Sequence, residues 1–246
     1  MLTPDRWLQH LEKHVPIALE GVDPEGIHQV RVAGRRLRVL MELGGHRALV
    51  GDLRWLVRAL GRMRDIDVLT PLLSGDGSPT EEAGDDGVEA WLAGLTQDAR
   101  LEAHEVLTSP RLEGLMQALR HLPPLDEALA RRTLRTFADR VRKALDVAIH
   151  AKQSPEARVD AIHALRRALR RLRYARDWLD EDSRVLKDLQ DALGAMCDLT
   201  ALSRLLAELG IAEGLDVSRV RQRLDRAHRR MSDELLRTPA VLAALG

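Results

Sequence analysis

One eleven-residue pattern occurs twice in the chain and constrains its fold more than any other feature. The pattern is His-x-x-Arg-x-x-x-Arg-Arg-Leu-Arg; it begins at His28 and again at His163, 135 residues later. On an α-helix that turns about 100° per residue, the histidine and three of the arginines fall within an arc of roughly 80°. We call these residues, with one flanking arginine in each copy, stripe 1 (His28, Arg31, Arg35, Arg36 and Arg38) and stripe 2 (His163, Arg166, Arg170, Arg171 and Arg173).

Apolar residues occupy the opposite side of both predicted helices. They are Val30, Ala33, Leu37 and Met41 in the first copy and Leu165, Ala168, Leu172 and Leu179 in the second. This separation is typical of an amphipathic helix that packs one side against a core. We therefore predict that these eight residues face the core.

A second pair of segments extends the repeat. The segment LRWLVRALGRMRDIDVL from Leu53 aligns without gaps on LKDLQDALGAMCDLTAL from Leu186, 133 residues later. Two copies of a helix–helix unit indicate an internal duplication and predict two helical bundles related by a pseudo-twofold axis. We expect one domain over residues 1–246, with the first repeat at about 1–122 and the second at about 123–246.

Capping residues and turn formers place the predicted helices. Residues 3–5 (Thr-Pro-Asp) and 23–25 (Asp-Pro-Glu) are typical of helix starts, and residues 44 and 45 (Gly-Gly) of a helix end. The scarcity of aromatic residues, which make up 2% of the chain, also favours an all-α fold. We expect an exposed loop at 74–87 and helices at about 3–19, 23–44, 47–73 with a break near Gly61, 88–107, 110–121, 124–152, 154–179, 183–209, 216–236 and 239–245.

The charge pattern predicts an anionic ligand. Neither eleven-residue copy contains an acid, although the chain carries 38 basic and 38 acidic residues. Like charges one helical turn apart destabilise a helix by a few tenths of a kcal/mol per pair. The alternative is that acids on neighbouring helices neutralise the stripes in salt-bridge networks. The recurrence of the same five basic positions favours ligand binding, because core packing alone would preserve the leucines and let the charges vary.

An extended polyanion fits the stripes best. Each stripe is roughly 15 Å long, so it can meet several consecutive anionic groups. Guanidinium groups form paired, charge-assisted hydrogen bonds with phosphate oxygens, and a neighbouring phosphate favours the protonated form of a histidine. Two pseudo-symmetric stripes that face one another would form a continuous basic groove.

These segments resemble the conserved histidine α-helical domain, or CHAD domain. Residues 28–38 are very similar to the first motif of that family, residues 163–174 resemble its second motif, and LGRMRDIDV from Leu60 resembles a third. The resemblance covers about residues 20–240. It implies an all-α fold of two four-helix bundles with a basic surface between them, binding of inorganic polyphosphate through the ten stripe residues, a cytosolic and often granule-associated setting, and no catalytic activity.

Other functions are weaker predictions. Nucleic-acid backbone binding is the main alternative, although only Tyr174 and Trp178 lie near a stripe as aromatic platforms for bases. A polyphosphate phosphohydrolase would need acidic residues to hold a divalent metal, and the eleven-residue copies contain none. His10 and His14 have a metal-compatible spacing that is common by chance, so we expect no metal and no cofactor. No apolar run approaches the ~20 residues that cross a bilayer, and we expect a cytoplasmic protein.

The acids of the third motif have two interpretations. Asp65, Asp67 and Asp198 could orient stripe arginines, or they could be helix-start acids that follow the Leu-Gly break. Cys197 is a single cysteine and excludes an internal disulfide. It is most simply a small packing residue.

Overall fold

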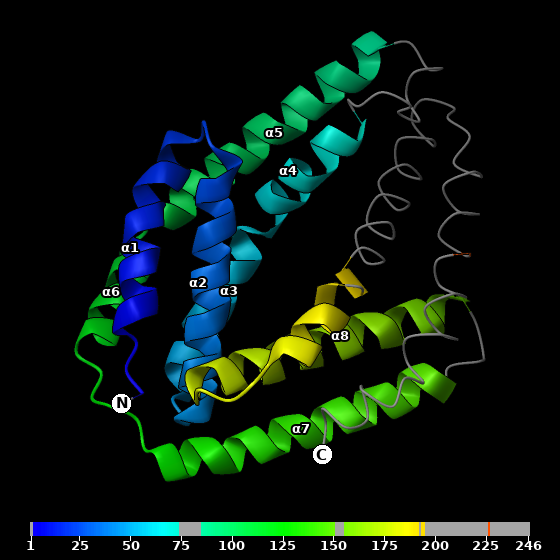
Figure 1. The fold of residues 1–246 in the computed structure, drawn as a ribbon. Coiled ribbons are helices and arrows are strands. Elements are labelled where there is room, and N and C mark those ends of the chain that lie inside the picture. Colours follow the sequence, from blue (N-terminus) through cyan, green and yellow to red (C-terminus); the bar gives the residue numbers. More distant parts are fainter. Residues whose placement is uncertain (1, 74–84, 151–154, 192, 195–225, 227–246) are drawn as a thin grey trace. The chain divides into compact units, whose positions relative to one another are not determined.

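The computed structural model describes residues 2–73, 85–150, 155–191, 193, 194 and 226. Apart from one isolated antiparallel bridge between Leu2 and Leu125, the regular structure of these residues is helical, which confirms the all-α prediction. The helices, labelled in Figure 1, are α1 (Asp5–Glu20), α2 (Pro24–Leu43), α3 (Arg47–Ala59), α4 (Gly61–Leu73), α5 (Asp85–Leu107), α6 (Pro110–Arg120), α7 (Glu127–His150) and α8 (Pro155–Trp178). A further helical run covers residues 184–191.

The helix ends lie within three residues of their predicted positions, and the predicted break falls between α3 and α4. Most of the predicted loop, all of the helices predicted at 216–236 and 239–245, and the second half of the one predicted at 183–209 lie outside the described residues.

At the start of α1, the Thr-Pro-Asp segment predicts Thr3 as the cap and Pro4 in the first turn, and the structure corrects this detail. The cap position is Pro4, with no side-chain cap, and the Thr3 hydroxyl donates to the Asp5 carboxylate instead. At the start of α2, by contrast, Asp23 accepts a hydrogen bond from the backbone N–H of Glu25, as a helix cap should.

The chain divides into two compact units, Met1–Leu129 and Ala130–Gly246. In the first unit α2 packs against both α1 and α3, which lie beside it in Figure 1. The pseudo-twofold relation of two four-helix bundles stays a prediction, as do the proposed repeat boundary and the basic groove between the bundles.

The predicted apolar face of α2 is its core face. Val30, Ala33, Leu37 and Met41 are all fully buried. At Gly26 a Cβ atom would lie 2.5 Å from the backbone nitrogen of Ala18, so the lack of a side chain lets α2 approach the backbone of α1. This close packing fixes the rotation of α2 and with it the side on which stripe 1 lies.

The predicted core face of α8 is correct except at one residue. Leu165, Leu172 and Leu179 are buried, but Ala168 is half-exposed and its neighbour Leu169 is buried instead. The buried face of α8 consists of residues that lie three or four positions apart in the sequence. Ala168 lies about 100° from Leu169 around the helix axis. Ala168 therefore marks the edge of the core.

Candidate anion-binding site

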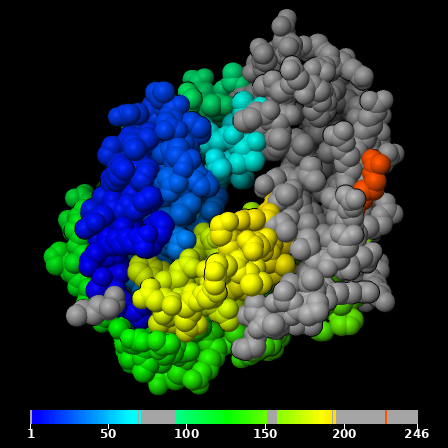
Figure 2. Space-filling view, viewed as in Figure 1, coloured from blue at the N-terminus to red at the C-terminus, as the bar shows by residue number. Residues whose placement is uncertain are grey.

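The structure places each stripe on a single helix, stripe 1 on α2 and stripe 2 on α8. All ten side chains are half-buried. This is the burial expected of long basic side chains whose stems cover apolar surface while their charged ends reach toward water. Side chains of α8, yellow in Figure 2, form part of the surface shown there.

Arg31 contacts the end of a neighbouring helix. Its Nη1 atom donates a hydrogen bond of 2.5 Å to the carbonyl oxygen of Val57. Val57 belongs to the last turn of α3, whose carbonyl groups lack helical partners and carry the negative end of the helix dipole. The break after α3 thus supplies an acceptor that holds a stripe arginine.

The two flanking arginines lie over aromatic rings. The guanidinium carbon of Arg36 is 4.5 Å from the ring centroid of Trp7 on α1, and that of Arg171 is 5.8 Å from the ring centroid of Phe137 on α7. Both distances are within the range of cation–π attraction. In each case the aromatic residue comes from the helix that precedes the stripe in sequence. Trp7 and Phe137 were not predicted as site residues.

One stripe arginine has a carboxylate beside it. Nε of Arg38 lies 3.5 Å from Oε1 of Glu42, four residues later on α2, and both side chains are largely buried. Glu42 follows the eleven-residue pattern, so the absence of acids within the pattern does not exclude this pair. Internal neutralisation, the alternative to ligand binding, therefore applies to this end of stripe 1.

Several other acids pair with arginines outside the stripes. In the first unit the ion pairs Arg62–Glu102, Arg111–Asp52 and Arg120–Glu12 connect α4 to α5, α6 to α3 and α6 to α1. These pairs link neighbouring helices of the first unit. The equal numbers of acids and bases in the chain therefore do not by themselves mean that the acids neutralise the stripes.

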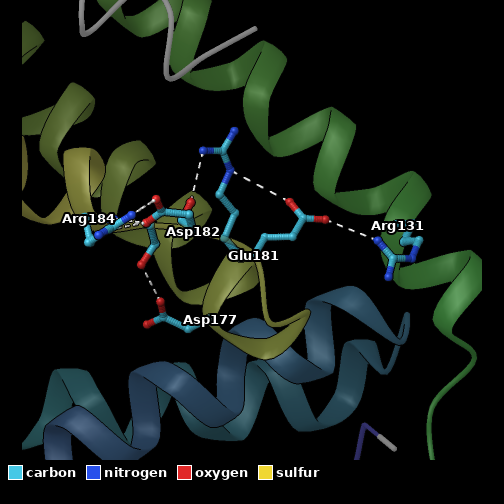
Figure 3. Close-up of polar contacts among 7 residues, drawn as sticks. Arg131, Asp177, Glu181, Asp182 and Arg184 are labelled. Carbon is cyan, nitrogen blue, oxygen red and sulfur yellow. Dashed lines mark hydrogen bonds and ion pairs between the residues drawn. The ribbon is translucent and has the colours of Figure 1, made fainter.

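The second unit has a similar ionic cluster just after α8. Glu181 pairs with Arg131 of α7 at 3.2 Å and with Arg176 of α8 at 4.0 Å, and Figure 3 shows the Arg131 pair. Beside it, Arg184 donates to the Asp182 carboxylate, which lowers the pKa of Asp182 to about 2. The arginines of this cluster are again not stripe residues.

His28 lies in a positive environment. Burial is the main reason that the pKa of its imidazole is below the ordinary value of 6.5, and Arg64 lowers it next; Glu25 opposes this effect, while Arg35 and Arg31 add to it. The ring is therefore largely neutral near pH 7 until an anion balances these charges.

The structure separates the two acids of the third motif that it describes. The first turn of α4 contains no acid, so neither Asp65 nor Asp67 is a helix-start residue. Burial raises the pKa of Asp65, and the charges of Arg31, Arg35 and Arg64 oppose this rise, so the stripe 1 arginines act on this carboxyl group electrostatically. Asp198 and Cys197 lie outside the described residues.

Asp67 lies in a different environment. It lines a pocket of about 930 Å³ between the α1–α2 turn and helices α4 and α5. Burial raises the pKa of its carboxyl group, while Arg64 and Arg100 oppose the rise. Arg100 and His104 also line this pocket.

The histidine pair on α1 is engaged in hydrogen bonds. Nε2 of His10 lies 2.7 Å from Oε1 of Gln29, and Nδ1 of His14 lies 2.8 Å from the carbonyl oxygen of His10. In the part of the chain that is described, no three His, Cys, Asp or Glu side chains form a group that could hold a metal ion. No described helix is both long and apolar enough to cross a membrane.

Comparison with known proteins identifies the family. The CHAD domain family model matches residues 5–207, and the chain therefore belongs to the CHAD domain family. No curated protein matches the chain.

Two solved structures have a similar fold. The CHAD domain from the plant Ricinus communis is 26% identical, with a TM-score of 0.69 over 98% of this chain and 88% of that one. PptA from Streptomyces chartreusis is 18% identical, with a TM-score of 0.66 over 96% of this chain and 99% of that one, and so supports the fold alone.

Proposed function

We propose that this CHAD domain protein binds inorganic polyphosphate without catalysing a reaction, through the ten residues of stripes 1 and 2. Binding of this kind would dock the protein at polyphosphate granules in the cytoplasm. The observation that carries the proposal is the repeated geometry: both stripes lie on one face of a helix whose other face is buried, and all ten basic side chains are half-buried at the edge of the core.

The arrangement suits a phosphate polymer on physical grounds. Half-buried guanidinium groups interact with an anion in a lower effective dielectric than water, which strengthens the attraction. Contacts with Val57, Trp7 and Phe137 restrict several of these groups before any ligand arrives. This restriction lowers the entropy that binding has to remove.

Of the two aromatic residues near stripe 2, Tyr174 offers no stacking platform for single-stranded nucleic acid, whereas Trp178 is half-buried. Tyr174, the aromatic residue next to stripe 2, is 4% exposed and lies against Arg173, with the guanidinium carbon 4.9 Å from its ring centroid. A ring this buried cannot serve as a platform for an unstacked base. Binding to the phosphate backbone of a duplex needs no such platform. Competition between polyphosphate and RNA or DNA distinguishes it from polyphosphate binding.

The decisive experiment is a titration of the purified protein with polyphosphate, compared with the variant in which Arg31, Arg35, Arg166 and Arg170 are all changed to Glu. We expect the variant to retain its helical circular dichroism and lose binding. A charge-matched control changes four exposed arginines outside the stripes to Glu: Arg54, Arg58, Arg132 and Arg135. The control should keep most of the affinity, and equal losses in the two variants would mean that only net charge matters.

Two further measurements test the competing functions. RNA or DNA that displaces polyphosphate at an equal concentration of phosphate groups would favour nucleic-acid binding over the proposal. Release of inorganic phosphate from polyphosphate in the presence of Mg²⁺ or Mn²⁺ would show that the protein is a phosphohydrolase. We expect neither result.

A further inference from the structure

We propose that Gly61 and Gly194 are positioning residues, each of which leaves the space in which the first arginine of a stripe is held for ligand binding. A Cβ atom at Gly61 would lie 3.4 Å from Nη1 of Arg31, and one at Gly194 would lie 3.2 Å from Nη2 of Arg166. Each glycine is the second residue of the Leu-Gly pair in its repeat. The inference rests on the proposed function of the stripes.

The backbone does not require glycine at either position. Both residues have helical backbone, and the described glycines with positive φ are Gly21 and Gly45. Glycine within a helix is less stable than alanine by roughly 1 kcal/mol. At Gly194 the missing side chain therefore leaves the space that Arg166 occupies, whereas at Gly61 a methyl group would still fit and only a larger side chain would meet Arg31.

That space determines where the guanidinium group lies. In the first unit Gly61 begins α4 directly after the break, and the Arg31 guanidinium lies against it while donating to the carbonyl oxygen of Val57. A larger side chain at position 61 would occupy the site of the guanidinium and break this hydrogen bond. In the second unit Arg166 lies against the equivalent glycine at an even shorter distance.

The two distances predict different tolerance of a methyl group. A separation of 3.4 Å is an ordinary van der Waals distance, whereas 3.2 Å requires the neighbour to move. We expect Gly61→Ala to leave polyphosphate affinity unchanged and Gly194→Ala to weaken it about threefold. Valine at either position should weaken it about tenfold, which corresponds to removal of one charge-assisted hydrogen bond.

Matched controls are available in the same molecule. Gly51 of α3 and Gly114 of α6 are helical, and a Cβ atom at either would meet nothing within 4 Å. Gly51→Val and Gly114→Val should leave the affinity unchanged. A loss of affinity in these controls equal to that in Gly61→Val would overturn the inference.

A double-mutant cycle tests whether Gly61 acts through Arg31. In an Arg31→Met background, Gly61→Val should cause no further loss of affinity, because the group that it displaces is already gone. An equal loss of affinity in both backgrounds would overturn the inference. If the valine variant does not fold, the Gly194→Ala variant in wild-type and Arg166→Met backgrounds replaces it and gives the same two outcomes.

The result also separates the two proposals. A wild-type protein that does not bind polyphosphate contradicts the proposed function. A wild-type protein that binds, together with glycine variants that are folded and bind equally well, contradicts only the positioning role.

Discussion

The two stripes share residue types and spacing but differ in how their last arginine is held. In stripe 1, Arg38 lies beside the Glu42 carboxylate at 3.5 Å. In stripe 2, the corresponding Arg173 lies over the ring of Tyr174, and the acid four residues later, Asp177, accepts a hydrogen bond from Ser183. The side chain of Asp177 is one methylene shorter than that of Glu42. Thus the same pattern of charges can lead to internal pairing in one copy and to a different contact in the other.

Two other contacts are alike in the two copies. Arg36 and Arg171 each lie over an aromatic ring, and Arg31 and Arg166 each lie against the glycine of a Leu-Gly pair. An internal duplication would produce this agreement, and the duplication stays a prediction. Any difference in ligand affinity between the two stripes should therefore arise at Arg38 and Arg173, whose contacts differ.

Removing two arginines from one stripe at a time tests whether both stripes bind the same ligand. We expect Arg31→Gln with Arg35→Gln to weaken polyphosphate binding by about a hundredfold or more, because each hydrogen bond to a charged group is worth roughly 1.5–3 kcal/mol. Arg166→Gln with Arg170→Gln should have a similar effect. By analogy with nucleic acids, the slope of log affinity against log salt should fall by about 0.7–0.9 for each arginine–phosphate pair removed. Isothermal titration at several salt concentrations measures both quantities. A large effect of one double substitution and none of the other would show that the stripes are not equivalent.

Changing the two acids should have opposite effects. Glu42→Gln removes a carboxylate that competes with the ligand for Arg38, so polyphosphate affinity should rise by up to about fivefold, the equivalent of roughly 1 kcal/mol. Asp177→Glu gives position 177 the length of Glu42, so that it can pair with Arg173. This change should lower the affinity by a similar factor. Competition titrations of the two variants measure these changes. If both variants raised or both lowered the polyphosphate affinity, the proposed difference between Arg38 and Arg173 would be wrong.

His28 should control how the stability of the free protein and its polyphosphate affinity change with pH. Because its pKa is below 6.5 in the folded protein, the unfolded chain takes up this proton first as the pH falls. The free protein should therefore lose stability as the pH falls from about 6.5 toward the folded pKa. A bound polyanion favours the imidazolium form, so polyphosphate affinity should rise over the same range, by about threefold.

The variant His28→Gln separates these effects from other titrations. It should lose both the fall in melting temperature of the free protein and the His28-dependent rise in affinity. Melting curves and titrations between about pH 7.5 and about pH 5.5, a range in which histidine titrates, measure both. An unchanged pH profile in this variant would show that His28 does not contact the ligand or respond to it.

The flanking arginines should contribute the least. Arg36→Lys and Arg171→Lys keep the charge but weaken the contact with the aromatic ring, so each should reduce the free energy of unfolding by about 0.5–1 kcal/mol. The effect should be larger at Arg36, where the guanidinium carbon is 4.5 Å from the ring centroid, than at Arg171, where it is 5.8 Å. Urea denaturation measures the difference. The reverse order would indicate that ring distance does not set the strength of these interactions.

Much of the fold could be predicted from the sequence because its signals are local. Asp23 and Pro24 begin α2, the Leu60–Gly61 pair marks the break before α4, and the spacing of Val30, Ala33 and Leu37 identifies a buried face. These signals depend on backbone geometry and helical periodicity, which operate within a few residues. The Arg38–Glu42 pair is also local, at i and i+4, but it was not predicted because Glu42 lies just beyond the repeated pattern.

The remaining contacts of the site could not be predicted in this way. Trp7, Val57 and Gly61 reach stripe 1 from other helices, and their positions depend on how α1, α3 and α4 pack against α2. The prediction for Ala168 was wrong because the spacing does not fix the exact width of a buried face. Small rotations of a helix decide such cases, and they result from the packing of all its neighbours.

The sequence by itself determined that this chain is helical, that a basic pattern occurs twice, and that each copy places its charges on one side of a helix, because periodicity and capping are properties of nearby residues. Only the tertiary structure decided which groups lie against the arginines: a helix-end carbonyl, two aromatic rings, two glycines and one glutamate. Most of these groups are distant in sequence from the arginines that they hold, and side-chain packing between helices brings them together.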